Sequence, residues 1–242
     1  MKFMNSTSKM NFDARSPVGL LNSEMDGLTR EILKQEVKDG ESWLDLGCGM
    51  KPFLSSFSRA HYVGIDVESS GADESMKSPD LYFNGNNVPF SKNFFDGILC
   101  TQVLEHAKDS DSLIRECNRV LKTGGKTIVS VPFLVREHEQ PYDFRRFTSF
   151  GLVDLLEKNG FKVSKLIKVL SPIETLATLF VTYLINTYGS KSKWLYRLIA
   201  YTIVAPSLIL ARLISMNTKT DRDIYCVLIV VAAKEVDLVQ PK

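Results

Sequence analysis

The 242-residue sequence has little that could hold a fold together covalently, because it contains only four cysteines. None of them belongs to a C-x-x-C pair or a zinc-finger spacing, which excludes a disulfide scaffold and fits a reducing compartment. The sequence also lacks a large excess of charge of either sign, since 30 basic and 28 acidic side chains give a net charge of +2. That balance is too neutral for a protein that coats nucleic acid, so we expect no nucleic-acid partner.

Two kinds of hydrophobic segment are also missing. Residues 1–16 are polar and lack the apolar core of a signal peptide. The longest uncharged runs, 175–190 and 198–211, are shorter than the roughly 20 residues that cross a bilayer. We therefore expect a cytoplasmic protein without a membrane-spanning helix.

The sequence does contain short apolar runs that alternate with amphipathic segments. It predicts strands over 42–46, 62–66, 81–83, 95–101, 126–131, 162–169 and 224–233. It predicts helices over 23–38, 109–122 and 148–159. Strands that alternate with helices indicate a mostly parallel α/β sheet. We expect a single domain made of a lead-in with a helix (1–40), a cofactor-binding core (41–169), an apolar helical insert (170–223) and a final strand (224–234).

A glycine-rich turn follows the first of these strands. Asp45, Gly47 and Gly49 form a D-x-G-x-G pattern, in which the glycines let the backbone turn tightly and a ligand lie against it. Asp66 ends the next strand, where a carboxylate can accept hydrogen bonds from both hydroxyls of a ribose. The pattern predicts a nucleoside-bearing cofactor.

The residues near this turn also indicate which nucleoside. A dinucleotide fingerprint needs a third glycine where this chain has Pro52, and no G-K-[ST] is present for a triphosphate. The carboxylate of Asp45 would repel a pyrophosphate and attract a cation. These features favour S-adenosylmethionine, whose amino group and sulfonium are positively charged.

The core resembles the class I S-adenosylmethionine-dependent methyltransferases, and within them the type 11 methyltransferase domain. The resemblance covers residues 42–161 and rests on four landmarks in order, which are the glycine motif at 45–49, the acid at 66, the segment 84–96 and the L-E-H and L-x-x-G-G pair at 104–106 and 121–125. It implies a doubly wound, Rossmann-like, seven-stranded sheet whose last strand is antiparallel, here with a helical insert before that strand.

The resemblance also implies which residues hold the cofactor. Gly47 and Gly49 would lie under the methionine part, Asp45 would hold its amino group and Asp66 would bind the ribose. The other implied contacts, to the adenine and the pocket wall, are Val67, Asn84, Gly85 and Gln102. The family usually has Asp in place of Asn84, so a contact there would carry no charge.

The acceptor should approach from loops beyond the carboxyl ends of the strands. Residues 137–147 crowd charged and aromatic side chains around His138 and resemble the H-E-x-P-x-D-[FY]-x-R-[FY]-T stretch of a bacterial subgroup of the family. We expect His138 to be a general base or an acceptor-orienting group, and the residues that shape its site to be Tyr142, Asp143 and Arg145. The alternative is a structural lid in which Asp143 pairs with Arg145 or Arg146.

A second histidine follows the fourth strand. His106 is either a further catalytic residue or a histidine that forms a hydrogen bond beneath the cofactor loop. Local spacing does not support a metal held by His106, His138 and Glu139, so we expect no metal.

The segment 172–216 is unusually apolar, and we predict two helices in it, over 172–188 and 193–216, with Pro206 kinking or breaking the second. Residues 175–220 hold five basic and no acidic side chains. Three roles fit this composition: a cover over the acceptor pocket, a homodimer interface, or contact with a membrane surface. Membrane contact would place the protein at the inner face of the membrane as a peripheral protein.

The sequence therefore predicts an enzyme that transfers a methyl group from S-adenosylmethionine to a small-molecule acceptor, with glycans and lipid-linked compounds among the candidates. Oxygen is the expected acceptor atom, because no N-P-P-Y motif for methylation of base amino groups is present. One alternative is a non-catalytic S-adenosylmethionine-binding scaffold or regulatory protein. A second alternative is a nicotinamide-dependent oxidoreductase, which is disfavoured because Pro52 stands where a dinucleotide-binding motif needs its third glycine.

Overall fold

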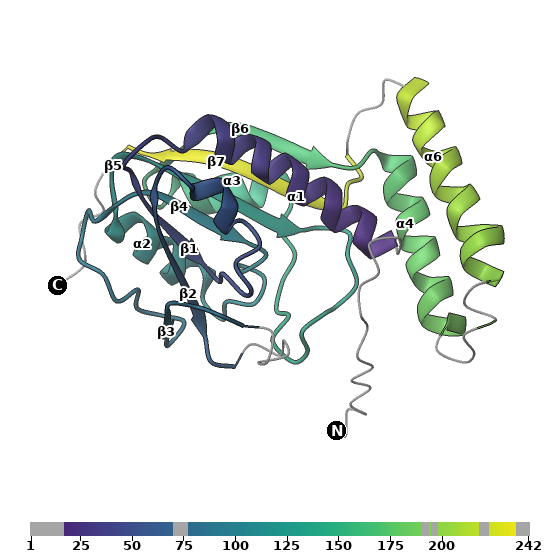
Figure 1. The fold of residues 1–242 in the computed structure, drawn as a ribbon, viewed down its shortest axis with the longest axis horizontal. Helices are drawn as coiled ribbons and strands as arrows, with labels where there is room; N and C mark the ends of the chain where they lie inside the picture. Colours follow the sequence, from purple (N-terminus) through teal and green to yellow (C-terminus); the bar gives the residue numbers. More distant parts are fainter. Residues whose placement is uncertain (1–16, 70–76, 190–193, 195–197, 218–222, 236–242) are drawn as a thin grey trace. The chain divides into compact units, whose positions relative to one another are not determined.

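The computed structural model describes residues 17–69, 77–189, 194, 198–217 and 223–235. The chain forms two compact units (Figure 1). The larger consists of Gly27–Pro172 and Thr220–Lys242, and the smaller of Met1–Asp26 and Ile173–Lys219.

A seven-stranded sheet with the strand order β3-β2-β1-β4-β5-β7-β6 forms the larger unit. Strand β7 runs antiparallel to β5 and β6, and the other pairs are parallel. This order confirms the predicted doubly wound α/β sheet with an antiparallel last strand. The strands are β1 (Ser42–Leu46), β2 (His61–Val67), β3 (Leu81–Phe83), β4 (Phe95–Thr101), β5 (Leu121–Pro132), β6 (Phe161–Val169) and β7 (Val227–Lys234).

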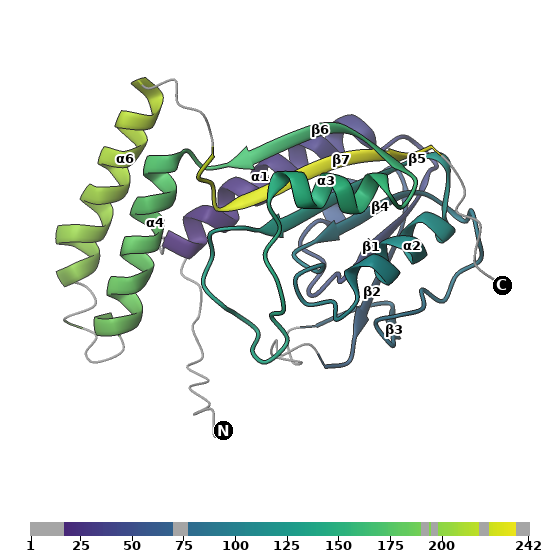
Figure 2. The ribbon, with the colours of Figure 1, turned by 180° about the vertical axis from the view of Figure 1, so that it is seen from behind.

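Helices cover both faces of the sheet. The part of α1 (Pro17–Glu36) that belongs to this unit lies on one face, and α2 (Ser110–Val120) and α3 (Ser149–Glu157) lie on the other (Figures 1 and 2). Asp109 and Thr148 cap the first turns of α2 and α3, and each accepts a hydrogen bond from a backbone amide. The central strands are buried on both sides, which explains their nearly continuous apolar sequences.

The largest differences from the predicted element boundaries are at the start of α1 and at the start of β5. Helix α1 begins at Pro17, well before the expected Ser23, because proline fits the first turn of a helix. Strand β5 begins at Leu121, directly after α2. The glycines at 124 and 125 therefore lie within β5, where its pairing with β4 shifts register between Phe95 and Gly97. Helix α2 ends at Val120, two residues before the predicted end.

The smaller unit contains two apolar helical segments that lie side by side. One is α4 (Pro172–Leu184), continued by a π-helical turn over Ile185–Gly189, and the other is a π-helical segment over Ala200–Val204 followed by α6 (Ala205–Asn217). The carboxylate of Glu174 accepts hydrogen bonds from Arg212 at 2.8 Å and from Ser215 at 3.0 Å, which ties α4 to α6.

The proline in the second helical segment does not break it. Pro206 is the second residue of α6, and α6 follows the π-helical segment directly, so that the missing amide of Pro206 falls where the hydrogen-bond pattern already changes. The predicted start at residue 193 lies outside the described residues.

Within the described part of the chain, one helix, Ala200–Asn217, is long and apolar enough to cross a membrane by length and composition. The sequence-based expectation rested on uncharged runs, and the run 198–211 ends directly before Arg212. A span tolerates that single charge, so counting uncharged residues underestimated this segment. Only 11% of it is buried inside the protein, unlike the core helix of a soluble domain.

Candidate functional site

The glycine turn after β1 packs against the start of the next loop. Gly47 has a φ of +74°, and a Cβ there would overlap the Cγ2 atom of Val103. The amides of Gly47 and Cys48 both donate to the carbonyl of Ile65, at 2.8 and 3.1 Å. The turn therefore requires glycine at 47 for both its backbone conformation and its packing.

Asp45, the last polar residue before this turn, is buried, and one of its two carboxylate oxygens accepts a hydrogen bond. Its Oδ2 accepts a hydrogen bond from the hydroxyl of Tyr62 at 2.6 Å, whereas Oδ1 has no partner among the described residues. Burial raises the pKa of Asp45 to about 7. An unpaired buried carboxylate oxygen is costly unless a ligand group donates to it. Sequence reasoning missed Tyr62, which holds the carboxylate in place.

Asp66 closes the turn from the end of β2. Its Oδ2 accepts from the amide of Gly49 at 2.9 Å, and its Oδ1 lies 3.3 Å from the ammonium of Lys77. Lys77 is nearly buried and also donates to the carbonyl of Val67 at 2.8 Å. The structure thus brings the predicted ribose-binding acid to the glycine turn. It also adds a lysine that no motif indicated.

The residues predicted to bind adenine form a second turn beside Val67. The side-chain oxygen of Asn84 accepts hydrogen bonds from the amides of Asn86 and Asn87, both at 2.9 Å. Gly85 has a φ of +80°, and a Cβ there would lie 3.4 Å from Val67. The oxygen of Asn84 therefore shapes the turn, which brings Gly85 against Val67.

Gln102 is held at the carboxyl end of β4. It has a φ of +55°, its amide donates to the carbonyl of Ser130 at 2.9 Å, and its side-chain nitrogen donates to the hydroxyl of Ser130 at 3.2 Å. These bonds fix the start of the loop that carries Val103 and the residues after it.

That loop and the connection between β5 and α3 meet in a cluster of one carboxylate and two imidazoles. Glu105 is fully buried, and neither of its carboxylate oxygens has a hydrogen-bond partner among the described residues. The Nε2 atoms of His106 and His138 lie 3.8 and 3.9 Å from its Oε1. Burial raises the pKa of Glu105 to about 8. We name Glu105, His106 and His138 the Glu-His-His cluster.

Hydrogen bonds from the connecting loop orient both rings. Nδ1 of His106 lies 3.0 Å from the carbonyl of Tyr142, and Nδ1 of His138 lies 3.3 Å from the carbonyl of Arg136. The amide of His138 donates to Asp143, which is paired in turn with Arg146. Burial and the neighbouring His106 lower the pKa of His138.

The structure separates the predicted catalytic residues into two groups. His106, His138 and Asp143 come together, and Tyr142 contributes its backbone carbonyl. Arg145 is not part of this arrangement, because its guanidinium donates to Ser110 and to the carbonyl of Lys108. Arg146, not Arg145, pairs with Asp143. Glu105 was part of a quoted motif but was not predicted as a site residue.

The ligand atoms of the Glu-His-His cluster lie within 4.8 Å of one another, so these residues could hold a metal ion. The sequence-based expectation of no metal considered only spacing along the chain. Spacing could not show that loops more than thirty residues apart place both imidazoles beside Glu105.

Glu139 links this cluster to the predicted ribose site. Its carboxylate lies 3.8 Å from Nε2 of His106. Burial raises the pKa of Glu139, the charges of His106 and Lys77 oppose that rise, and the charge of Asp66 adds to it. The residues predicted to meet the cofactor and those of the cluster therefore lie within electrostatic reach of each other.

Residues 44–129 match the family model of a methyltransferase domain. The chain is 29% identical over 170 residues to the (+)-O-methylkolavelool synthase of Herpetosiphon aurantiacus, covering 60% of each chain. It is 29% identical over 131 residues to the ubiquinone/menaquinone biosynthesis C-methyltransferase of Vibrio cholerae, covering 46% of this chain and 50% of that one. The chain thus spans 60% and 50% of the length of these two relatives.

The solved structure of a methyltransferase-like protein from Bacillus halodurans has the same fold. It superposes with a TM-score of 0.54 at 17% identity, covering 87% of this chain and all of that one. At this identity the likeness concerns the fold alone, and it agrees with the sheet order and the antiparallel last strand.

Proposed function

Residues 44–129 match a methyltransferase domain, and from this premise we propose that the chain methylates a hydroxyl oxygen of a small-molecule acceptor bound at the Glu-His-His cluster, with S-adenosylmethionine as the methyl donor. The supporting observation is that this cluster lies within electrostatic reach of Asp66, through Glu139. A methyl group and its acceptor must meet at such a junction.

The residues of the predicted cofactor site fit S-adenosylmethionine. The unpaired Oδ1 of Asp45 can accept a hydrogen bond from the cationic amino group. Gly47 and Gly49 have no side chains, so the backbone beside this amino group stays accessible to the cofactor. The carboxylate of Asp66 can accept hydrogen bonds from the ribose hydroxyls while it stays paired with Lys77. When bound, S-adenosylmethionine supplies a methyl group that its sulfonium activates.

The protein then has to position the acceptor oxygen. The rings of His106 and His138 are fixed by the loop, and the side chain of His138 remains 27% exposed, so we assign the acceptor hydroxyl to its open side. In the transfer the S–CH3 bond is replaced by an O–CH3 bond, and the hydroxyl proton passes to water at the exposed side of His138. Alignment of the hydroxyl oxygen with the methyl group is the main contribution that we assign to these residues.

Binding and turnover test this function separately. Calorimetry with S-adenosylhomocysteine and with NAD should give binding of the first only, which excludes the oxidoreductase. Release of S-adenosylhomocysteine in the presence of candidate hydroxyl compounds, followed by mass spectrometry of the product, then distinguishes an enzyme from a scaffold. His138→Ala should lower turnover about a hundredfold or more; near-normal turnover would remove His138 from catalysis.

A second proposal concerns the smaller unit, which we assign to contact with the surface of an anionic membrane that carries a lipid-linked acceptor. Its helical segments present many large apolar side chains to solvent, among them Trp194, Tyr201, Ile209, Leu210, Leu213 and Met216. Aromatic and aliphatic side chains in this arrangement are typical of helices that lie in the membrane interface.

The charges of the smaller unit support an anionic surface. Residues 175–220 contain no acidic side chain and five basic ones. Of these, Arg212 is paired with Glu174 and Glu24, and the other four lie outside the described residues. Each further basic side chain near an anionic surface contributes about 1 kcal/mol.

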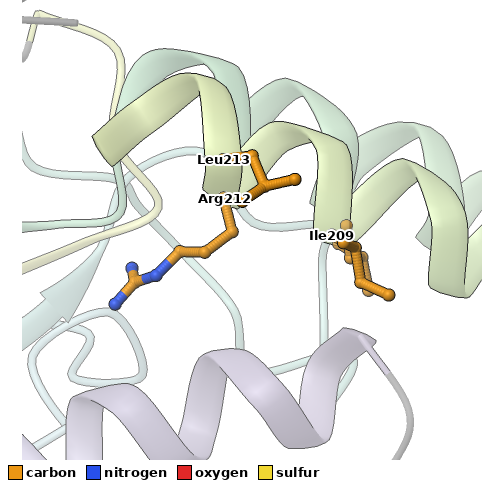
Figure 3. A pocket seen from close by; sticks show the side chains of 4 residues that line it. Ile209, Arg212 and Leu213 are labelled. Atoms are coloured by element: carbon orange, nitrogen blue, oxygen red, sulfur yellow. The ribbon is translucent and has the colours of Figure 1, made fainter. Parts of the chain in front are cut away.

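One shallow hollow of about 250 Å³ lies on this unit. It is lined by Leu208, Ile209, Arg212 and Leu213, all of which project from α6 (Figure 3). The apolar side chains of this hollow therefore belong to the same surface that we assign to the membrane.

A further inference from the structure

The ligand atoms of the Glu-His-His cluster are arranged as in a metal site but lie slightly farther apart than metal ligands do. The two Nε2 atoms lie 3.8 and 3.9 Å from Oε1 of Glu105, too far for a hydrogen bond. In a tetrahedral site with metal–ligand bonds of about 2.1 Å, neighbouring ligand atoms are about 3.4 Å apart. The three ligand atoms lie within 4.8 Å of one another, so each pair has to close by at most about 1.4 Å to reach that spacing, which small side-chain rotations can supply.

The buried carboxylate provides a second, independent indication of a ligand. Glu105 has no exposed surface, and neither of its oxygens accepts a hydrogen bond from any described residue. Arg146 is the nearby cation, but its guanidinium pairs with Asp143. Buried acceptors without partners are rare in proteins and call for an unobserved partner. A cation between Glu105 and the two imidazoles would supply it.

Both imidazoles are held in the tautomer that a metal ligand requires. A backbone carbonyl can only accept a hydrogen bond, so Nδ1 of His106 and Nδ1 of His138 must carry the hydrogen that they direct at Tyr142 and Arg136. This leaves the lone pair on each Nε2, the atom that lies nearest to Glu105. Metal-binding histidines are typically oriented by such a hydrogen bond from the opposite ring nitrogen.

We propose that Glu105, His106 and His138 bind a divalent transition-metal ion such as Zn²⁺, with a coordination position left open for the acceptor oxygen. Two imidazoles and one carboxylate suit Zn²⁺ and its first-row neighbours, whereas Mg²⁺ and Ca²⁺ prefer oxygen ligands alone. Three protein ligands are the usual set of an open, catalytic site. Glu139, 3.8 Å from His106, can add a fourth ligand or negative charge. The role of the open position rests on the proposed function.

Metal binding can be tested without activity. The full chain is freed of metal with a chelator, dialysed and titrated with Zn²⁺ by calorimetry. A parallel titration with Co²⁺ records the visible absorption of the bound ion. We expect one Zn²⁺ per chain and an intense Co²⁺ spectrum typical of low coordination number. His138→Ala and Glu105→Gln should each weaken Zn²⁺ binding at least a hundredfold and abolish that spectrum.

His61 provides the matched control, because it is the remaining histidine of the chain and lies exposed at the start of β2. His61→Ala should bind Zn²⁺ as the unchanged protein does. The metal site is overturned if the unchanged protein binds no Zn²⁺, or if His138→Ala, which removes a part-exposed loop side chain and should leave the fold intact by circular dichroism, binds as tightly as before. Loss of binding in His61→Ala would equally overturn it, since it would identify a surface site.

Titration of the same samples with S-adenosylhomocysteine keeps the two proposals apart. Cofactor binding without Zn²⁺ binding would overturn the metal site and leave the methyltransferase function standing. Zn²⁺ binding without cofactor binding would overturn the proposed function and leave the metal site standing.

Discussion

At the scale of single residues, the predicted cofactor site and the Glu-His-His cluster each contain one buried carboxylate. Asp45 has one oxygen and Glu105 has both oxygens without a hydrogen-bond partner among the described residues. Burial raises the pKa of each, to about 7 and about 8. Groups that fold into such positions do so at a cost in stability that a bound ligand group can offset.

The pKa of Asp45 leads to a pH-dependent affinity for the cofactor. Burial keeps Asp45 protonated below about pH 7, and a cationic amino group favours the ionised form. Between pH 6 and pH 8 the ionised fraction rises about tenfold for a pKa near 7. The association constant for S-adenosylhomocysteine, measured by calorimetry, should rise by the same factor. Asp45→Asn should bind more weakly and with no such rise; an equal rise in this variant would assign the effect to another group.

Gly47 allows a test of the turn beneath the cofactor. A side chain at a φ of +74° costs about 1–2 kcal/mol, and its Cβ would also overlap Val103. Gly47→Ala should weaken S-adenosylhomocysteine binding about tenfold or more and lower the melting temperature. The control is Gly27→Ala in α1, where a Cβ meets nothing within 4 Å and the helix should gain about 0.5–1 kcal/mol. Equal affinities for the two variants would contradict the role of the turn.

At the scale of elements, the connection between β5 and α3 is built around one arginine. Arg146 pairs with Asp143 and donates to the carbonyls of Val135 and Arg136, at 3.3 and 3.1 Å. It therefore ties the outgoing arm of the connection to the returning arm. Arg145 instead joins the connection to the start of α2.

The two arginines should differ in their effect on stability and on the acceptor site. Arg146→Ala leaves the nearly buried Asp143 unpaired, which should cost about 2 kcal/mol and lower the melting temperature by about 4–8 °C for a chain of this length. It should also raise the KM for the acceptor, because Asp143 no longer fixes His138. Arg145→Ala should change both less. Calorimetric melting and steady-state kinetics measure the two effects, and the reverse order would refute this assignment.

At the scale of the whole molecule, all residues assigned to the cofactor and to the Glu-His-His cluster belong to the larger unit, and the exposed apolar helices α4 and α6 belong to the smaller one. The residues assigned to the reaction and the exposed apolar helices therefore belong to different units of the chain. The predicted insert 170–223 corresponds closely to the part of the smaller unit that spans Ile173–Lys219.

Flotation with liposomes tests the membrane contact. The protein should float with vesicles that contain anionic lipid and less so with neutral vesicles or in high salt. Replacing Ile209 and Leu213 together by serine removes about 3 kcal/mol of apolar burial and should reduce flotation strongly. Phe150→Ser is the control, because Phe150 is 85% exposed on α3 of the larger unit. Absence of flotation, with dimers by gel filtration, would assign the surface to a homodimer.

The sequence alone determined the strands, the glycine turn and Asp66, because each depends on a short local pattern: the alternation of apolar runs, a backbone that only glycine adopts, and a strand end. The doubly wound order of the sheet followed from the family resemblance. The two helices of the apolar segment were also predicted, although their π-helical turns over Ile185–Gly189 and Ala200–Val204 were not.

Only the tertiary structure decided which polar groups meet. Lys77 beside Asp66, Tyr62 beside Asp45 and Arg146 beside Asp143 follow from long-range packing that no spacing along the chain encodes. The same holds for Glu105, a buried residue whose partners His106 and His138 come from two different loops. Side-chain direction in a loop is set by the hydrogen bonds that anchor its backbone, and those bonds exist only once the sheet has brought the loops together.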